Sequence, residues 1–292
     1  MKDICGLLLL KFKGGYYTQN IERAKVLLFS ISFFWTDPEP FEIFICIPGE
    51  ELDEAKSRIP SYKNLILHFV DENVVVPEVT KLQANGWLKQ QILKLAAFNI
   101  LESKFFITLD PDVICCKEIS REIFLPRGRA LSQWEYRTCH PNWWLASSRL
   151  LGMEATQTQM GLGVTPNILV TDVCRSLAGH LNTRSAENWW NYLTSKEMLS
   201  AAPLGNSWTE YTLYNVFLEN CGILSQYHWQ FMECGGMMLH SSPSVWRPHE
   251  FENWNPDDAF SGKKPGYFLI CQSSTEISVD KIWHKIGKYF PS

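Results

Sequence analysis

The stretch that most constrains this chain is residues 104–117, which read KFFITLDPDVICCK. Residues 105–109 are apolar, with aromatic and β-branched side chains, which is the pattern of a short buried strand. Pro111 has no N–H for a strand ladder and disfavours the helical region for the residue before it, so we expect the strand to end at Asp110. Two carboxylates, Asp110 and Asp112, therefore follow a core strand directly.

This pair of carboxylates indicates a site for a divalent metal. Two like charges held close together repel each other unless a cation joins them. Mg²⁺ and related ions bind one or two protein carboxylates and complete their shell with substrate phosphates and water. The carboxyl end of the strands is also where ligands bind in open α/β sheets. The alternative is a plain turn, because Asp-Pro-Asp is equally good turn chemistry.

The first 115 residues alternate between strand and helix patterns. Strand patterns occupy residues 4–10, 41–47, 65–70 and 105–109, and helical patterns lie between them, the strongest at 87–101. This alternation predicts a parallel sheet with right-handed crossovers. Neither GxGxxG nor GxxxxGKS is present, so we do not expect the usual dinucleotide fold or a phosphate loop. The prediction is an α/β, Rossmann-type half-domain.

The second half has a less regular pattern. It predicts strands at 130–134, 235–239 and 267–271, and helices at 142–151, 172–181, 209–219 and 279–289. We find no internal repeat, low-complexity segment or linker. The prediction is therefore one compact domain over residues 1–292.

Composition narrows the class of protein. The chain has 292 residues, 46% of them hydrophobic and 20% charged, which is ordinary for a globular protein. Its net charge of −4 implies no general attraction to nucleic acid or to an anionic membrane. The 9 cysteines form no CxxC pair, which favours free thiols in a reducing compartment.

Apolar stretches of the chain are too short for a signal peptide or a membrane span. We therefore expect a cytoplasmic protein with no transmembrane segment and no nucleic-acid partner. Peripheral contact with a membrane stays open.

The helix predicted at 87–101 carries a polar stripe. Trp87, Gln91 and Lys94 stand at positions i, i+4 and i+7, beside the apolar core face. Lys94 could therefore neutralise a diphosphate bound at the metal, as a point charge. The alternative is an ordinary solvated lysine on a helix surface.

Glu210 stands in the first turn of the helix predicted at 209–219. Ser207 or Thr209 is a suitable cap for this helix. A carboxylate there complements the helix dipole, which explains it without a function. In a pocket, the same carboxylate could act as a general base and take a proton from an attacking hydroxyl.

Two further features are candidates for ligand binding. The segment 161–166, GLGVTP, is an ordinary loop or a place where the backbone approaches a ligand, with Gly163 and Thr165 as its binding residues. His240 follows an apolar run and is a candidate third metal ligand, because imidazole suits ions such as Mn²⁺. A structural histidine is the alternative to that role, and His249 is the nearby alternative ligand.

Tryptophan is abundant in the second half of the chain. Of 12 tryptophans, 9 lie in the interval 134–254. Large rings commonly fill a core. They also serve as platforms for the C–H faces of sugar rings, and the clustering favours this role for one or two of them.

Taken in order, these parts resemble a glycosyltransferase of the GT-A type. GWLKQQILKL before LDPD, then GVTP, WTEYTLY and a late CQSS, are similar to a poorly characterised glycosyltransferase-like family over nearly the whole chain. The resemblance implies a GT-A-like mixed sheet with flanking helices. It also implies a nucleotide-sugar half at about 1–130 and an acceptor half at about 131–292.

The resemblance also implies roles for individual residues. Asp110 and Asp112 match the DxD motif that holds Mn²⁺ or Mg²⁺ against the diphosphate of a nucleotide sugar. Glu210 matches the acidic base that inverting GT-A enzymes carry at the start of a helix. The implied activity is metal-dependent transfer of a hexosyl or pentosyl group to a glycan, glycoconjugate or other hydroxyl acceptor, as in polysaccharide biosynthesis.

Two other functions stay open from the sequence. A nucleotide-sugar pyrophosphorylase would share the sheet and an acidic metal site, but should carry a glycine-rich basic loop after the first strand. Lys13, Gly14 and Gly15 are a poor version of that loop. A non-catalytic glycan-binding module would explain the tryptophans but not the two aspartates.

Overall fold

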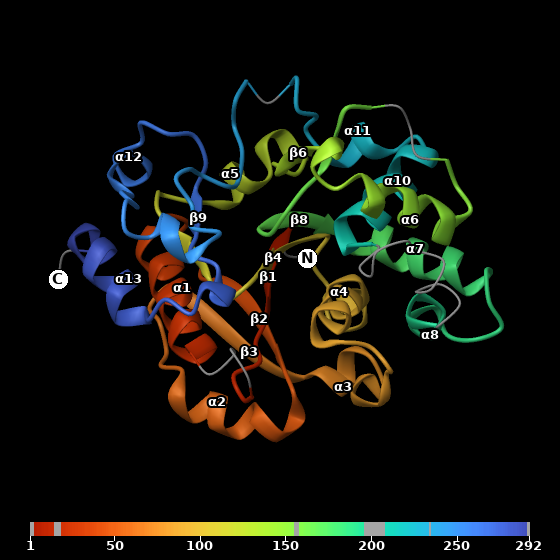
Figure 1. Ribbon diagram of the computed structural model, residues 1–292, viewed down its shortest axis with the longest axis horizontal. Helices are drawn as coiled ribbons and strands as arrows, with labels where there is room; N and C mark the ends of the chain where they lie inside the picture. The colour runs from red at the N-terminus through yellow and green to blue at the C-terminus, as the bar shows by residue number, and fades with distance from the viewer. Residues whose placement is uncertain (1–2, 15–18, 155–157, 196–207, 234, 291–292) are drawn as a thin grey trace.

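A five-stranded sheet lies at the centre of the computed structural model, which describes residues 3–14, 19–154, 158–195, 208–233 and 235–290 (Figure 1). Its strands are β1 Ile4–Leu9, β2 Phe41–Ile47, β3 Leu65–Asp71, β4 Phe105–Leu109 and β8 Asn167–Val170. Their spatial order is β3-β2-β1-β4-β8. The first four strands run parallel, and β8 pairs antiparallel with β4.

The four parallel strands are those that the hydrophobic pattern predicts. Every residue of β1 and β4 is buried, as expected for central strands covered on both faces. β4 ends at Leu109, so Asp110 and Asp112 leave from the carboxyl edge of the sheet. The predicted α/β fold, a mixed sheet with flanking helices in a single domain, is confirmed.

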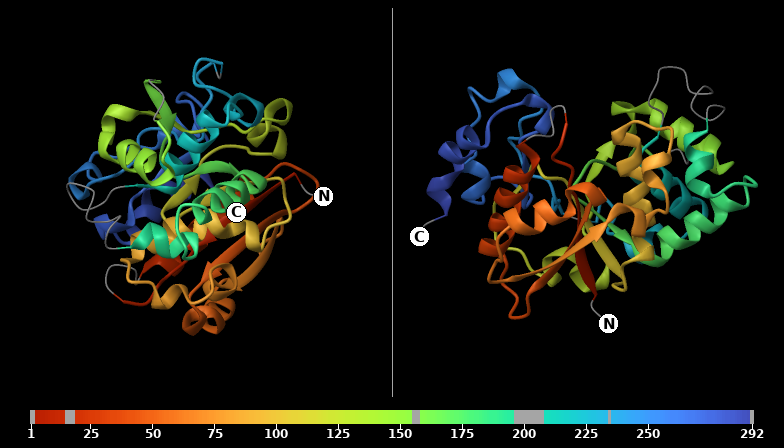
Figure 2. Two further views of the ribbon diagram at one scale, coloured as in Figure 1. Left: turned by 90° about the vertical axis from the view of Figure 1, so that its right-hand side faces the viewer. Right: turned by 90° about the horizontal axis from the view of Figure 1, so that it is seen from below.

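Helices cover both faces of the sheet (Figures 1 and 2). One side carries α1 Asn20–Phe34 and α13 Val279–Ile286, and the other carries α4 Gly86–Ala96, α7 Thr171–Asn182 and α10 Glu210–Asn220. α7 contacts both α4 and α10. The other α-helices among the described residues are α2 Leu52–Arg58, α3 Glu72–Val75, α5 Arg121–Phe124, α6 Pro141–Leu151, α8 Trp189–Thr194, α11 Leu224–Tyr227 and α12 Asp257–Phe260.

The end of the described chain returns to the first half. β9 Phe268–Ile270 pairs antiparallel with β5 Val113–Cys115, the strand that follows the two aspartates. Arg23 of α1 donates hydrogen bonds of 2.6 Å to the carbonyls of Cys271 and Ile277. Residues near the end of the described chain therefore pack within the predicted first half, residues 1–130. The predicted division into two functional halves stays a prediction.

The predicted strand at 235–239 is wrong. Gly235 and Gly236 have φ of 56° and 86° and form a turn, because glycine adopts positive φ at no steric cost. The strand predicted at 130–134 lies further along the chain. It is β6 Trp134–Tyr136, which pairs antiparallel with β7 Met160–Leu162.

The helix α10 begins at a capping box. The Thr209 hydroxyl accepts a hydrogen bond from the Thr212 backbone N–H at 3.1 Å, and the Thr209 N–H donates to the Thr212 hydroxyl at 3.0 Å. Two donors at the helix start are thereby satisfied, which fixes Glu210 in the first turn. Ser207, the other expected cap, lies outside the described residues.

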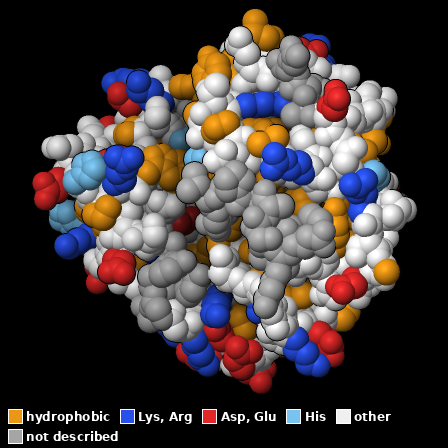
Figure 3. Space-filling model, turned by 45° about the vertical axis from the view of Figure 1, so that its right-hand side comes forward, with side chains coloured by type: hydrophobic (Ala, Val, Ile, Leu, Met, Phe, Trp, Pro, Cys, Tyr) orange, Lys and Arg blue, Asp and Glu red, His pale blue; other side chains and the backbone are white. Residues whose placement is uncertain are grey.

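Among the described residues, no helix is both long enough and apolar enough to cross a bilayer. On the face drawn in Figure 3, acidic and basic side chains lie in small groups of both signs. The eight cysteines among the described residues carry free thiols.

A fully buried histidine joins α10 to the segment before β6. His228 lies with its Nδ1 2.8 Å from the Ser132 hydroxyl and its Nε2 2.9 Å from the Tyr214 hydroxyl. Burial lowers the pKa of His228 to about 3, because the protonated ring would lose its hydration. The imidazole is therefore neutral in the folded protein at neutral pH.

We predict that acid destabilises the protein through His228. In the unfolded chain the ring binds a proton below about pH 6.5, whereas the folded protein resists it down to about pH 3. The free energy of unfolding should therefore fall by roughly 2 kcal/mol between about pH 7.5 and about pH 5 through this group alone. Urea unfolding at both pH values measures it.

His228→Gln should be less stable at neutral pH but should show a shallower acid dependence. The exposed His284→Gln on α13 is the matched control and should keep the wild-type slope. An unchanged slope in His228→Gln would contradict the prediction.

Candidate active site

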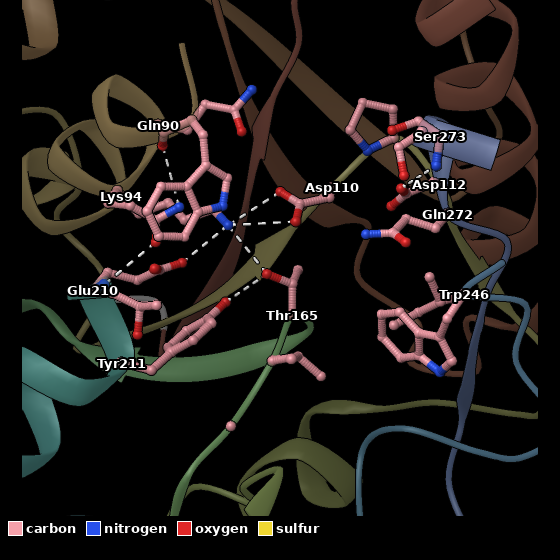
Figure 4. A pocket seen from close by; sticks show the side chains of 18 of the residues that line it. Gln90, Lys94, Asp110, Asp112, Thr165, Glu210, Tyr211, Trp246, Gln272 and Ser273 are labelled. Carbon is pink, nitrogen blue, oxygen red and sulfur yellow. Dashed lines mark hydrogen bonds and ion pairs between the residues drawn. The ribbon is translucent and has the colours of Figure 1, made fainter. Parts of the chain in front are cut away.

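A cavity of about 280 Å³ opens at the carboxyl edge of the sheet. It lies where β4 ends, between α4, the start of α10 and the segment after β9 (Figure 4). Eight of the predicted site residues line it: Trp87, Gln91, Lys94, Asp110, Asp112, Gly163, Thr165 and Glu210. His240 is not among the lining residues.

The two aspartates have different surroundings. Asp110 accepts from the Lys94 ammonium at 3.1 Å, and its side chain is 31% exposed. Asp112 accepts from the backbone N–H of Ser273 at 2.8 Å. Burial, and then the charge of Asp110, raise the pKa of Asp112 to about 6. The Asp110 charge therefore disfavours the ionised form of Asp112.

The Lys94 ammonium is the centre of a buried charged cluster. It lies 3.0 Å from Glu210 Oε1 and donates to the Thr165 hydroxyl at 3.1 Å, in addition to Asp110. Lys94 is 2% exposed and Glu210 is 1% exposed. Burial alone would lower the pKa of Lys94, but the carboxylates of Asp110 and Glu210 outweigh it and raise the pKa well above its ordinary value.

Glu210 is held on several sides. Burial raises its pKa, and the neighbouring Lys94 charge opposes this shift. Its backbone N–H donates to the Gln91 side-chain oxygen at 3.3 Å, which joins the start of α10 to α4. The predicted Gln91 and Lys94 stripe therefore faces the cavity rather than bulk solvent.

Tyr211 is linked to the Lys94 cluster through hydrogen bonds of its hydroxyl group. Its hydroxyl lies 2.6 Å from the Thr108 hydroxyl and 2.8 Å from the Thr165 hydroxyl. This chain of hydroxyls connects the interior of β4 to the loop after β7. Figure 4 shows this group on one side of the cavity and Asp112, Gln272, Ser273 and Trp246 on the other.

Glu135 is a cavity residue that sequence reasoning missed. It lies on β6 and packs against Gly163, where an added Cβ would come within 2.9 Å of the Glu135 Cγ. The absence of a side chain at Gly163 thus makes room for the Glu135 side chain. From the sequence, the alternatives were an ordinary loop or close approach of a ligand. No local motif marks Glu135, because only the fold places β6 against this loop.

Three of the twelve tryptophans line the cavity. They are Trp87, Trp143 and Trp246. The ring of Trp143 stacks on His140 with centroids 3.8 Å apart, and Trp246 is 37% exposed. Trp208 and Trp254, by contrast, are buried in the core. The tryptophans therefore divide between core packing and the cavity wall, as the clustering suggests.

His240 has a structural environment in this fold. Its Nε2 lies 2.7 Å from the Ser244 hydroxyl, and its backbone N–H donates to Gln133. Burial lowers the pKa of its ring to about 4. Among the described residues, no group of three or more His, Cys, Asp or Glu side chains is arranged to hold a metal ion. Asp110, Asp112 and His240 therefore do not form the three-ligand set expected from the sequence.

Comparison with protein families covers the whole chain. The model of DUF6492, a family of unknown function, matches residues 1–292. The chain belongs to this family. Among curated proteins, none matches the chain.

Solved structures similar to this DUF6492 protein have low sequence identity to it. Mouse xyloside xylosyltransferase 1, in its apo form, is similar with a TM-score of 0.53 and 15% identity, over 94% of this chain and 99% of that chain. Core-mannan synthase A from Aspergillus fumigatus, in a Mn/GDP form, has a TM-score of 0.48 and 10% identity, over 78% of this chain and 73% of that chain. The expected resemblance to GT-A-type glycosyltransferases is confirmed for the fold.

We predict that Lys94 stabilises the site by compensating two carboxylates. Lys94→Met should lower the free energy of unfolding by about 3–5 kcal/mol, because it leaves Asp110 and Glu210 without their buried cation. Urea unfolding measures the loss.

The double variant tests the pairing itself. Lys94→Met combined with Glu210→Gln should cost less than the sum of the two single variants, with a coupling of roughly 0.5–3 kcal/mol. Strict additivity would mean that the two side chains do not stabilise each other.

Proposed function

We propose that this protein is a glycosyltransferase that moves a sugar from a nucleotide-sugar donor to a hydroxyl acceptor with the help of a divalent metal. The observation that carries the proposal is the position of Asp110 and Asp112, at the carboxyl edge of a GT-A sheet and in the wall of its cavity. Ligands of open α/β sheets bind at that edge.

The charge balance of the cavity supports a metal. The described residues that line it include one cation, Lys94, and four carboxyl groups: Asp110, Asp112, Glu135 and Glu210. An anionic diphosphate entering this cavity would be repelled, and Lys94 already has two carboxylate partners. A divalent cation held by Asp110 and Asp112 would offset this repulsion.

The two aspartates fit Mn²⁺ or Mg²⁺. Both ions accept one or two carboxylates and complete an octahedral shell with water and substrate phosphate. Burial and the neighbouring charge of Asp110 raise the pKa of Asp112, as expected for a carboxyl group that a bound cation would stabilise. Asp110 and Asp112 would hold the ion, which would supply positive charge to the leaving diphosphate.

The protein's own residues position this chemistry. Lys94 fixes the orientation of Asp110, and Thr165 and Tyr211 fix Lys94 in turn. Trp87, Trp143 and Trp246 line the cavity, where their rings would contact the sugars of donor and acceptor. The acceptor oxygen attacks the sugar carbon as the bond to the diphosphate loosens, with oxocarbenium character on the sugar.

A second cavity of about 220 Å³ is a candidate for the nucleoside. It lies at the carboxyl ends of β1 and β2, and Gln90 lines both cavities. Its wall carries charges of both signs, from Lys11 and Lys89 and from Glu50 and Glu72. A nucleotide sugar spanning the two would place its diphosphate between the nucleoside and the aspartates.

The predicted role of Glu210 as a general base, and with it an inverting reaction, stays a prediction. Its carboxylate lines the cavity but is paired with Lys94 at 3.0 Å and nearly fully buried. A base must accept a proton from the acceptor, and the Lys94 charge opposes this because it favours the ionised form of Glu210.

The other two functions have less support. A nucleotidyltransferase would direct a basic loop after β1 toward the phosphates, but Lys13 pairs with Glu54 of α2 at 2.9 Å. A glycan-binding module would not require the buried Lys94 cluster beside two further carboxylates. Sugar transfer accounts for both the aromatic wall and the charged groups.

We predict that Asp112→Asn abolishes Mn²⁺-dependent nucleotide binding. Calorimetric titration with UDP and GDP, with and without Mn²⁺, measures this. The melting temperature should stay unchanged or rise, because the variant removes the repulsion with Asp110 and its amide oxygen can still accept from Ser273.

The exposed Asp280→Asn on α13 is the matched control and should bind like the wild type. Unchanged metal-dependent binding in Asp112→Asn would contradict the proposed metal site. A hydrolysis screen of nucleotide sugars with Mn²⁺, including UDP-xylose because one structural neighbour is named as a xylosyltransferase, tests the activity directly.

A further inference from the structure

Glu135 differs from the other carboxylates of the cavity because it has no partner among the described residues. Asp110 and Glu210 pair with Lys94, and Asp112 accepts from the Ser273 backbone. Within the described residues, the Glu135 carboxylate has no hydrogen bond or ion pair, although it is half-buried in the cavity wall. A half-buried carboxyl group without a protein partner is free to interact with a ligand in the cavity.

The position of Glu135 on β6 directs its side chain into the cavity. Its strand neighbours Trp134 and Tyr136 line a different cavity on the other face of β6, because successive side chains of a strand point to opposite faces. β6 is held in register against β7, with Glu135 opposite Gly161. Gly163 then leaves room for the Glu135 side chain, which any Cβ at that position would displace.

The surroundings of Glu135 suit proton transfer near neutral pH. Burial raises its pKa to about 7. The other charged groups of the cavity, Lys94, Asp110, Asp112 and Glu210, do not contribute to this shift. A catalytic carboxyl works best when its pKa lies near the operating pH, since it is then available as a base and still accepts a proton readily.

We propose that Glu135 is the general base of the transfer reaction. The proposal rests on the proposed function. As the acceptor oxygen forms its bond to the sugar carbon, its proton moves to the Glu135 carboxylate. The bond from the sugar carbon to the diphosphate oxygen breaks, and its electron pair stays on the diphosphate.

Glu210 then has a different role. Its ion pair with Lys94 holds the ammonium between α4 and α10, and the same ammonium orients Asp110. Glu210 is therefore a positioning residue, and Glu135 takes the base role that the resemblance to GT-A enzymes implies for Glu210.

The experiment compares the wild type with Glu135→Gln, Glu135→Asp and the exposed control Glu118→Gln. Rates of Mn²⁺-dependent hydrolysis are measured with UDP-xylose, UDP-glucose and GDP-mannose, where water takes the place of the acceptor. UDP and GDP binding with Mn²⁺ and the melting temperature are measured on the same samples.

We expect kcat of Glu135→Gln to fall about 10²–10⁴-fold with nucleotide affinity unchanged. The melting temperature should stay the same or rise, because the amide removes a carboxylate that burial disfavours. The wild-type kcat should increase as pH rises through about 7, and Glu135→Gln should lose this dependence. Glu135→Asp should be intermediate, and Glu118→Gln should match the wild type.

Three results would overturn the inference. The first is a kcat in Glu135→Gln equal to that of the wild type. The second is a loss confined to nucleotide affinity, which would make Glu135 a binding residue. The third is a wild type that binds nucleotide with Mn²⁺ but hydrolyses none of the three nucleotide sugars, which would overturn the proposed function as well. Turnover in the wild type with an unaffected Glu135→Gln would remove the inference alone.

Discussion

The candidate site depends on one buried ammonium. Lys94 is 2% exposed, and a charge so deeply buried is tolerated only where oxygen partners replace its hydration. Those partners come from the end of β4, the loop after β7 and the start of α10, while Lys94 itself comes from α4. Four segments far apart in the chain must therefore meet before the ammonium is satisfied. The same contacts that stabilise it bring the aspartates, Thr165 and Glu210 to one cavity.

The four carboxyl groups of the cavity differ because their environments differ. Asp110 and Glu210 share the Lys94 charge, Asp112 has a backbone N–H and a repelling neighbour, and Glu135 has burial alone. When different environments move the pKa values of chemically identical groups apart, the carboxyl groups of one site can take different roles in a reaction. In the proposed enzyme, the aspartates hold a cation, Glu210 holds Lys94, and Glu135 takes a proton.

The sheet and its surrounding segments contribute in different ways. β4 is buried at all five positions, so the chain leaves it at a fixed point and the aspartates have little freedom. The short pairs β5–β9 and β6–β7 then bring Ser273 and Glu135 to the same edge. A rigid central sheet with variable segments at its carboxyl edge is a common arrangement for binding and catalysis.

The sequence by itself determined the features that depend on near neighbours. Strand and helix periodicity, the break at Pro111, the stripe of Gln91 and Lys94 and the cap at Thr209 are all local patterns, and the structure has each of them. The tertiary structure alone decided which distant groups meet. Glu135 enters the cavity through the pairing of β6 with β7, and Lys94 finds Glu210 across 116 positions of sequence, the difference between their residue numbers. The local hydrophobic pattern also gave a wrong prediction of a strand at 235–239, where two glycines in an apolar run form a turn. Contacts between distant segments are set by packing and charge compensation of the whole fold, and a single sequence carries no periodicity that reports them.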